Sequence, residues 1–172
     1  MADAGNPLLE EDLRQLRQIL EPLTQQFIQL QTLLLDEQEL LRKRDLDALE
    51  SLSGQIGEHL SKIRAIDQLR QRVTAQMAKR LGLKPEGLNL SVLDQAMGGD
   101  TGLQEMRQRL RQSIQQADKI NRTNQAVFTG VLAATESILS ALQGGTTSAT
   151  ASYNRLGSRQ TKTRFHLLSK QL

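Results

Sequence analysis

The sequence contains no cysteine and no tryptophan, and its 172 residues include one tyrosine, three phenylalanines and three prolines. The absence of cysteine excludes disulfides and thiolate metal sites. With so few aromatic residues, a hydrophobic core must consist mainly of leucine and isoleucine. Abundant leucine, glutamine, arginine and glutamate, together with little proline, are typical of long helices. We therefore predict an all-α protein.

Long apolar runs and targeting signals are also missing from the chain. No apolar run approaches the roughly 20 residues that a membrane-spanning helix needs. The N-terminus, MADAGNPLLEEDL, is acidic and lacks the basic segment followed by an apolar one that marks a signal peptide. We expect a soluble cytoplasmic protein without membrane insertion.

Motifs for catalysis or metal binding are absent as well. The two histidines, His59 and His166, do not belong to an HExxH motif, and the glycine-rich stretches GGDTG and GGTT do not belong to a GxxxxGK motif. We expect the acidic residues on solvent-facing helix surfaces, where they would not form a buried catalytic pair. We predict that the protein is not an enzyme and has no catalytic residue, cofactor or metal.

Charge is unevenly distributed, although the formal net charge is only +3. Residues 1–58 hold 12 acidic and 5 basic residues, a net charge of −7, whereas residues 59–172 hold 7 and 17, a net charge of +10. No acidic residue follows Glu136. This asymmetry favours two surfaces with different partners, or attraction between the two parts of the chain.

Three segments repeat apolar residues at intervals of three and four, which is the pattern of helices that pack along one face. The predicted helices span residues 7–44, 46–81 and 102–143, and a short connector helix capped by Ser91 precedes the third. The apolar stripe of the first helix consists of Leu9, Leu13, Leu16, Leu20, Leu23, Phe27, Leu30, Leu34 and Leu41. The stripe of the second consists of Leu49, Leu52, Ile56, Leu60, Ile63, Ile66, Leu69, Val73, Met77 and Leu81.

Local signals at the helix ends define the architecture. Asp45 is expected to cap the second helix, and Gly82 is expected to end it in a left-handed conformation. Because the turn before Asp45 is very short, the first two helices must be antiparallel, and the connector lets the third pack back on them. We predict three long helices in an antiparallel coiled-coil bundle over residues 1–145, followed by a flexible basic tail over residues 146–172.

Polar residues interrupt two of the stripes. Asn121 and Asn124 fall on the apolar stripe of the third helix, and Glu37 falls on that of the first. A buried polar layer of these three residues, with a hydrogen bond between Glu37 and one asparagine, would fix the alignment of the helices. The alternative is that the register slips and the asparagines face solvent.

The end of the third helix is apolar on more than one face, which exceeds the needs of a bundle core. This excess favours a partner helix that lies against it. The candidate partner-binding residues are Asn124, Phe128, Val131, Leu132, Ile138, Leu139 and Leu142. The alternative is that the whole stripe is core.

The tail carries basic residues and a short apolar stripe of Phe165, Leu168 and Leu172. Nucleic-acid binding by such a tail would be salt-sensitive and unspecific, and only Tyr153 and Phe165 could stack on bases. We therefore do not predict a nucleic-acid partner. The apolar stripe would instead allow the tail to fold back onto the third helix or onto a neighbouring molecule.

The segment LLLDEQELLRKRDLDALESL, residues 33–52, resembles the junction between the first two helices of FlgN-type flagellar export chaperones. In that family a leucine pair and an acidic pair precede a basic turn with aspartate and then Leu-x-x-Leu. The third helix of the family often carries Asn-x-x-Asn, here Asn121 and Asn124. Its tail often carries Tyr-x-x-x-Gly, here Tyr153 and Gly157, and the segment from Ser158 onward looks like an extension.

This resemblance implies a cytosolic chaperone of type III flagellar export. It implies cargo of the hook–filament junction proteins FlgK and FlgL, delivery to the export gate protein FlhA, and docking on that gate through Tyr153 and Gly157. We expect a monomer or weak dimer. The alternative function is a structural or self-associating coiled-coil scaffold without export cargo.

Overall fold

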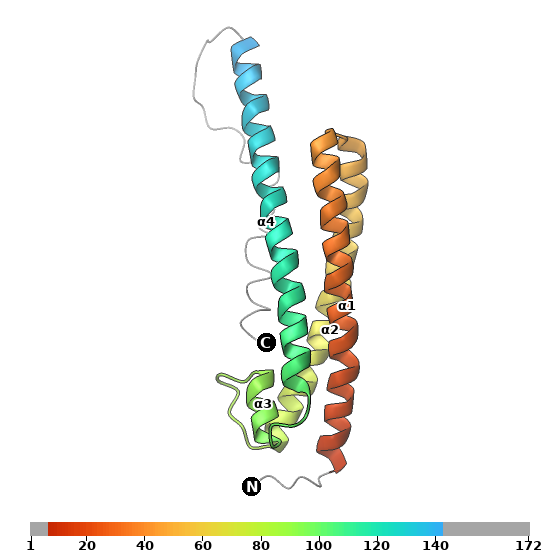
Figure 1. Cartoon of the computed structure of the whole chain (residues 1–172), viewed down its shortest axis with the longest axis vertical. Coiled ribbons are helices and arrows are strands. Elements are labelled where there is room, and N and C mark those ends of the chain that lie inside the picture. The colour runs from red at the N-terminus through yellow and green to blue at the C-terminus, as the bar shows by residue number, and fades with distance from the viewer. Residues whose placement is uncertain (1–6, 143–172) are drawn as a thin grey trace.

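The computed structural model describes residues 7–142, which form four helices and no strand (Figure 1). The helices are α1 (Pro7–Lys43), α2 (Leu46–Arg80), α3 (Leu90–Ala96) and α4 (Leu103–Leu142). The prediction of an all-α fold with three long helices and one short connector helix is confirmed. The tail predicted for residues 146–172 lies outside the described residues.

The helix α1 occupies the middle of the arrangement. It packs against α2 on one side and against α4 on the other, whereas no Cα atom of α2 lies within 8 Å of a Cα atom of α4. The short helix α3 contacts both α2 and α4 near the end of α2. The chain therefore forms an α1–α2 hairpin with α4 added along the free side of α1, and not a symmetric bundle.

The helix directions follow from contacts between residues far apart in the sequence. Asp12 meets Arg80 and Gln26 meets His59, so α1 and α2 are antiparallel. Between α1 and α4, contacting residues rise in number together along both helices. Gln31 donates to the Ser113 carbonyl, and further along the Leu34 carbonyl accepts from Asn124. α4 is therefore parallel to α1 and antiparallel to α2.

The signals at the helix ends agree with the structure in two places and differ in a third. Asp45 caps α2, since its carboxylate accepts a hydrogen bond from the Ala48 N–H at 3.1 Å. Gly82 takes the predicted left-handed conformation, with a φ of +67°, just after α2 ends at Arg80. The prediction that Ser91 caps α3 was wrong. Asn89 is the cap, because its side-chain oxygen accepts hydrogen bonds from the N–H groups of Ser91 and Val92 in the first turn of the helix.

The apolar stripe of α1 lies in the core, as the sequence predicted. Leu16, Leu20, Phe27 and Leu30 are completely buried. A fully buried side chain of this size contributes about 1.5–3 kcal/mol to folding. Two long stretches of α2 and α4 cover this one stripe, which explains why α1 takes the central position.

The prediction for α2 was partly wrong, because its inward face contains polar residues. Leu69 is 49% exposed, whereas Asp67, Arg70 and Thr74 are buried. Asp67 and Arg70 form an ion pair with an Oδ1–Nε distance of 2.7 Å. His59 is also buried and donates from Nε2 to the Gln26 carbonyl oxygen at 2.7 Å. The expectation that acidic residues lie on solvent-facing surfaces was therefore wrong for Asp67, and it was also wrong for Asp12 and Asp94.

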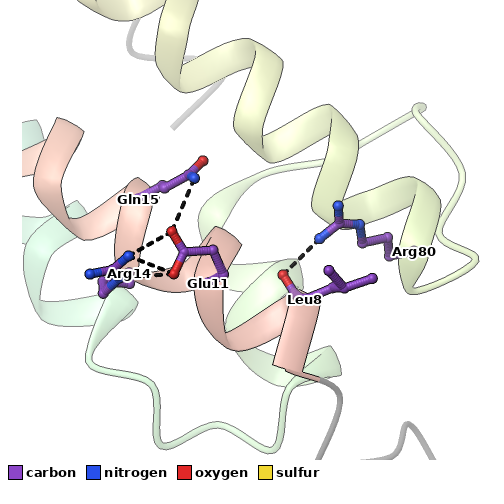
Figure 2. Close-up of polar contacts among 5 residues, drawn as sticks. All are labelled: Leu8, Glu11, Arg14, Gln15 and Arg80. Carbon is purple, nitrogen blue, oxygen red and sulfur yellow. Dashed lines mark hydrogen bonds and ion pairs between the residues drawn. The ribbon is translucent and has the colours of Figure 1, made fainter.

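Two further carboxylates are buried at the end of the molecule where α2 stops. Arg80 Nη1 donates to Asp12 Oδ2 at 2.6 Å and to the Leu8 carbonyl oxygen at 2.7 Å, as Figure 2 shows for the Leu8 contact. Asp94 of α3 accepts a hydrogen bond from the Thr101 hydroxyl. These contacts tie the first turn of α1 to the last turn of α2, and α3 to the start of α4.

An exposed cluster lies beside the Arg80 contact (Figure 2). Glu11 accepts hydrogen bonds from Arg14 at 2.7 Å and from Gln15 at 3.2 Å. The hydrogen bond from Arg14, and then that from Gln15, lower the pKa of the Glu11 carboxyl below its ordinary value. All three side chains belong to α1, so this cluster supports the helix locally and does not hold two helices together.

Candidate partner-binding surface

Asn124 is the last buried residue of α4. Its side chain is 3% exposed, and Nδ2 donates to the Leu34 carbonyl oxygen at 2.6 Å and to Glu37 Oε2 at 2.9 Å. Both acceptors belong to α1. The expected hydrogen bond between Glu37 and one of the two asparagines is present, and it fastens α4 to α1 shortly before α1 ends.

The remainder of α4, residues 125–142, is here called the α4 arm. None of its residues is buried. At 1.5 Å per residue it extends for about 27 Å. Figure 1 shows that the upper part of α4 leans away from the α1–α2 hairpin and continues past the turn of that hairpin. The packing of α4 on α1 therefore ends at Asn124.

The α4 arm carries an exposed apolar stripe. Phe128 and Leu132 are each 48% exposed, Leu139 is 51% and Leu142 is 77%. Their spacings of four, seven and three residues place them along one side of the helix. Above Asn124, the face that packs on α1 continues, and none of its residues is buried by the described part of the chain. Such a surface can bury a second amphipathic helix along its length.

The structure divides the seven candidate partner-binding residues into two groups. Six lie on the α4 arm, where five are exposed and Val131 is half-buried; they are Phe128, Val131, Leu132, Ile138, Leu139 and Leu142. Asn124 does not belong to this surface, because it is buried and its amide is used by α1. The candidate gate-docking residues Tyr153 and Gly157 lie outside the described residues.

The candidate polar layer is only partly assembled. Glu37 and Asn124 are in hydrogen-bond contact, and Glu37 is half-buried. Asn121 is also half-buried, one turn earlier on α4. The carbonyl oxygen of the Asn124 side chain is buried without a partner among the described residues. This orphaned atom is a cost that a purely apolar stripe would not have.

The model of the FlgN protein family matches residues 9–161. The chain belongs to the FlgN family. This membership confirms the resemblance that residues 33–52 suggested. FlgN-family proteins are associated with flagellar export chaperone function. No match to the chain was found among curated proteins or among solved structures.

The family match extends beyond the described helices of this FlgN-family chain. It includes Tyr153 and Gly157 and ends before Lys162. The last 11 residues, 162–172, therefore lie outside the part of the chain that the family shares.

The α4 arm also meets a length and composition test for a membrane-crossing helix. A window of 18 residues in α4 has a mean hydropathy of 1.3, and none of it is buried. Since Asn124 is the last buried residue, this window is the α4 arm itself. The expectation that no segment approaches this length and hydropathy was wrong. One such helix in a FlgN-family chain is weak evidence for a membrane, because a partner-binding helix has the same composition.

Acidic residues of the α1–α2 turn lie near the apolar surface of the α4 arm. Glu136 is the only ionisable residue of the arm. The α1–α2 turn next to it exposes Asp36, Glu39, Asp45, Asp47 and Glu50, against Arg42, Lys43 and Arg44. Leu46, at the turn, is 72% exposed. A partner that is both apolar and basic would complement this end of the FlgN-family chain.

A hollow of about 380 Å³ lies between α1 and α4, below Asn124. Its lining is mainly polar and includes four glutamines, and Ile28 is the single apolar side chain among its residues. Such a lining offers little apolar area to an amphipathic helix. The α4 arm is therefore the better candidate for partner binding.

Proposed function

We propose that this protein is a cytosolic chaperone of type III flagellar export. Its cargo would be hook–filament junction proteins of the FlgK and FlgL type, which it hands to an export gate of the FlhA type. The observation that carries the proposal is the apolar stripe of the α4 arm, which is exposed on a helix that the hairpin holds in place. Membership of the FlgN family supports the chaperone role.

The α4 arm binds cargo as one helix binds another. Phe128, Leu132 and Leu139 contact the apolar side of an amphipathic helix from the junction protein, and the polar side of that helix stays in solvent. Such helices mediate assembly of junction proteins and would associate early if they were left uncovered. Because the cargo helix would lie on an open helix surface and would not be enclosed, binding stays reversible, as delivery requires.

Gate docking is assigned to Tyr153 and Gly157. Both lie within the family match and beyond the end of α4. A tyrosine offers a large amphipathic ring at low cost in side-chain entropy, which suits a docking anchor. The site for the gate is thus separate in sequence from the site for cargo, so that both can be occupied during delivery.

The experiment is titration of the chain with peptides of the C-terminal helices of FlgK and FlgL, followed by amide exchange. We expect binding, with new protection in the α4 arm and little change in α1. Tyr153→Ala is expected to weaken binding of the gate protein and to leave peptide binding and the melting temperature unchanged. A complex whose protected amides lie outside the α4 arm would refute the proposed site.

The second candidate function is a self-associating coiled-coil scaffold. The uncovered stripe of the α4 arm supports it as well, since two arms could cover one another. Sedimentation at increasing protein concentration separates the two functions. A stable oligomer that ignores both junction-protein peptides would favour the scaffold, whereas a monomer or weak dimer that binds them favours the chaperone.

A further inference from the structure

The α4 arm is a large uncovered apolar surface for a soluble chain. Leu132, Leu139 and Leu142 are all about half exposed or more, and the residues that separate them along the helix include Ile138 and three alanines. Soluble monomers rarely leave a continuous apolar patch of this kind in contact with water. Some segment is therefore expected to cover the arm whenever no external partner is bound.

The chain itself supplies a segment with matching chemistry at its C-terminal end. Phe165, Leu168 and Leu172 are spaced as i, i+3 and i+7, so a helical conformation would place them on one face. The same segment carries four ionisable or basic side chains and no acidic one; they are Lys162, Arg164, His166 and Lys170. It is thus both apolar and basic, which is what the α4 arm and the acidic α1–α2 turn together favour.

The tether between the two segments has a suitable length. Residues 143–164, between Leu142 and Phe165, number 22. A chain of that length rich in glycine, serine and threonine has a root-mean-square end-to-end distance of about 26 Å. The α4 arm is about 27 Å long. The terminal segment can therefore reach any part of the arm, and tethering gives it an effective concentration in the millimolar range.

We propose that residues 162–172 dock on the α4 arm of the same molecule and cover its apolar stripe when cargo is absent. Phe165 and Leu168 pack against Phe128, Leu132 or their neighbours, and the basic side chains lie toward the acidic α1–α2 turn. The docked segment would compete with cargo for the surface of the α4 arm. This competition rests on the proposed function, whereas the docking itself does not. Residues 162–172 follow the part of the chain that the family model matches. The proposed docking therefore concerns a segment of this chain that lies outside the family match.

The test compares hydrogen exchange of the full chain with that of a chain ending at Thr161, without any cargo. We expect the amides of the α4 arm to exchange at least about tenfold faster in the shorter chain, since their protection would follow the docked population. Amides of the buried half of α1 should exchange equally in both. Equal exchange of the arm in the two chains would overturn the proposal.

A matched pair of substitutions in the full chain refines this test. Leu168 lies on the i, i+3, i+7 stripe, whereas Leu167 is its neighbour and lies off the stripe. Leu168→Asp should reproduce the faster exchange of the shorter chain, and Leu167→Asp should retain most of the protection. Equal effects of the two substitutions would show that the stripe does not dock in this way.

Two measurements, at varied protein concentration and with lipid vesicles, identify what covers the α4 arm. Protection of the arm should be independent of protein concentration, because the docking is intramolecular. Protection that rises with concentration would assign the surface to a second copy, and protection only in the presence of phosphatidylglycerol vesicles would assign it to a membrane. Either result would overturn the proposal.

The regulatory consequence has a separate readout. A FlgK or FlgL helix peptide should bind the chain ending at Thr161 about tenfold more tightly than the full chain, because no tail has to be displaced. If the peptide binds neither chain, the proposed function fails while the exchange result still decides the docking. If the peptide binds both chains equally, the tail does not compete for the cargo surface.

Discussion

At the scale of single residues, Asn124 marks the point where α4 stops packing on α1. Its amide nitrogen binds the Leu34 carbonyl and the Glu37 carboxylate, whereas its own carbonyl oxygen has no partner among the described residues. An apolar residue at this position would pack at many alignments, but the two acceptors define one. We infer that Asn124 sets the register of α4 against α1 and thereby the length of the α4 arm.

Replacement of Asn124 tests this role. Asn124→Ala removes both hydrogen bonds and should lower the free energy of unfolding by about 1–3 kcal/mol, measured by urea denaturation. Asn121→Ala is the matched control, because this asparagine lies on the same side of α4 but is only half-buried. It should cause a smaller loss. A full loss at Asn121 and none at Asn124 would contradict the assignment of the register to Asn124.

At the scale of helices, α1 could be predicted from the sequence and α2 only in part. The stripe of α1 is apolar at nearly every buried position, so hydrophobicity alone reveals its inward face. The inward face of α2 passes through Asp67, Arg70 and Thr74, which hydrophobicity assigns to the surface. Leu69, in contrast, is an apolar residue that lies on the exposed side of α2. A buried ion pair between neighbours on one helix leaves no apolar signal that a sequence pattern could detect.

The buried ion pair of α2 yields a prediction at this scale. Asp67 accepts hydrogen bonds from Arg70 at 2.7 Å and from Gln71 at 2.6 Å, and the Arg70 side chain is 3% exposed. Arg70→Met leaves a buried carboxylate without its cation and should cost about 3–5 kcal/mol. The double change Asp67→Leu with Arg70→Met should recover most of that loss, because no buried charge remains.

Urea denaturation of Arg70→Met, Asp67→Leu and the double variant measures the coupling free energy between the two side chains. The double variant should be more stable than either single variant. If the losses of the two single variants simply add in the double variant, the two side chains do not act as a pair, and the account of the inward face of α2 is wrong.

At the scale of the whole molecule, the sequence predicted the helices and an apolar excess at the end of α4, but not how the helices are arranged. Six of the seven candidate partner-binding residues are exposed or half-buried on the α4 arm, and their role in binding a partner stays a prediction. Two features depend on three-dimensional packing and were not visible in the pattern. One is the central position of α1 between α2 and α4, and the other is the departure of α4 from the hairpin after Asn124.

The hairpin and the α4 arm divide two tasks between them. The hairpin, closed at one end by Arg80 and Asp12, is a stable support with a filled core. The arm extends from that support and presents apolar side chains that the fold itself does not use. We propose that the arm can bind and release a helix while the hairpin stays folded, because the buried core and the exposed apolar stripe share few residues.

We propose that the α4 arm binds an amphipathic helix of a junction protein, and a pair of leucines tests this binding most directly. Leu132 on the arm is 48% exposed and Leu69 on α2 is 49% exposed, so aspartate at either position should leave the melting temperature nearly unchanged. The measurement is the affinity of each variant for a FlgK or FlgL C-terminal helix peptide. We predict that Leu132→Asp weakens binding at least about tenfold, or ~1.4 kcal/mol, while Leu69→Asp has no effect. Unchanged binding by Leu132→Asp, or equal losses for the two variants, would contradict the account.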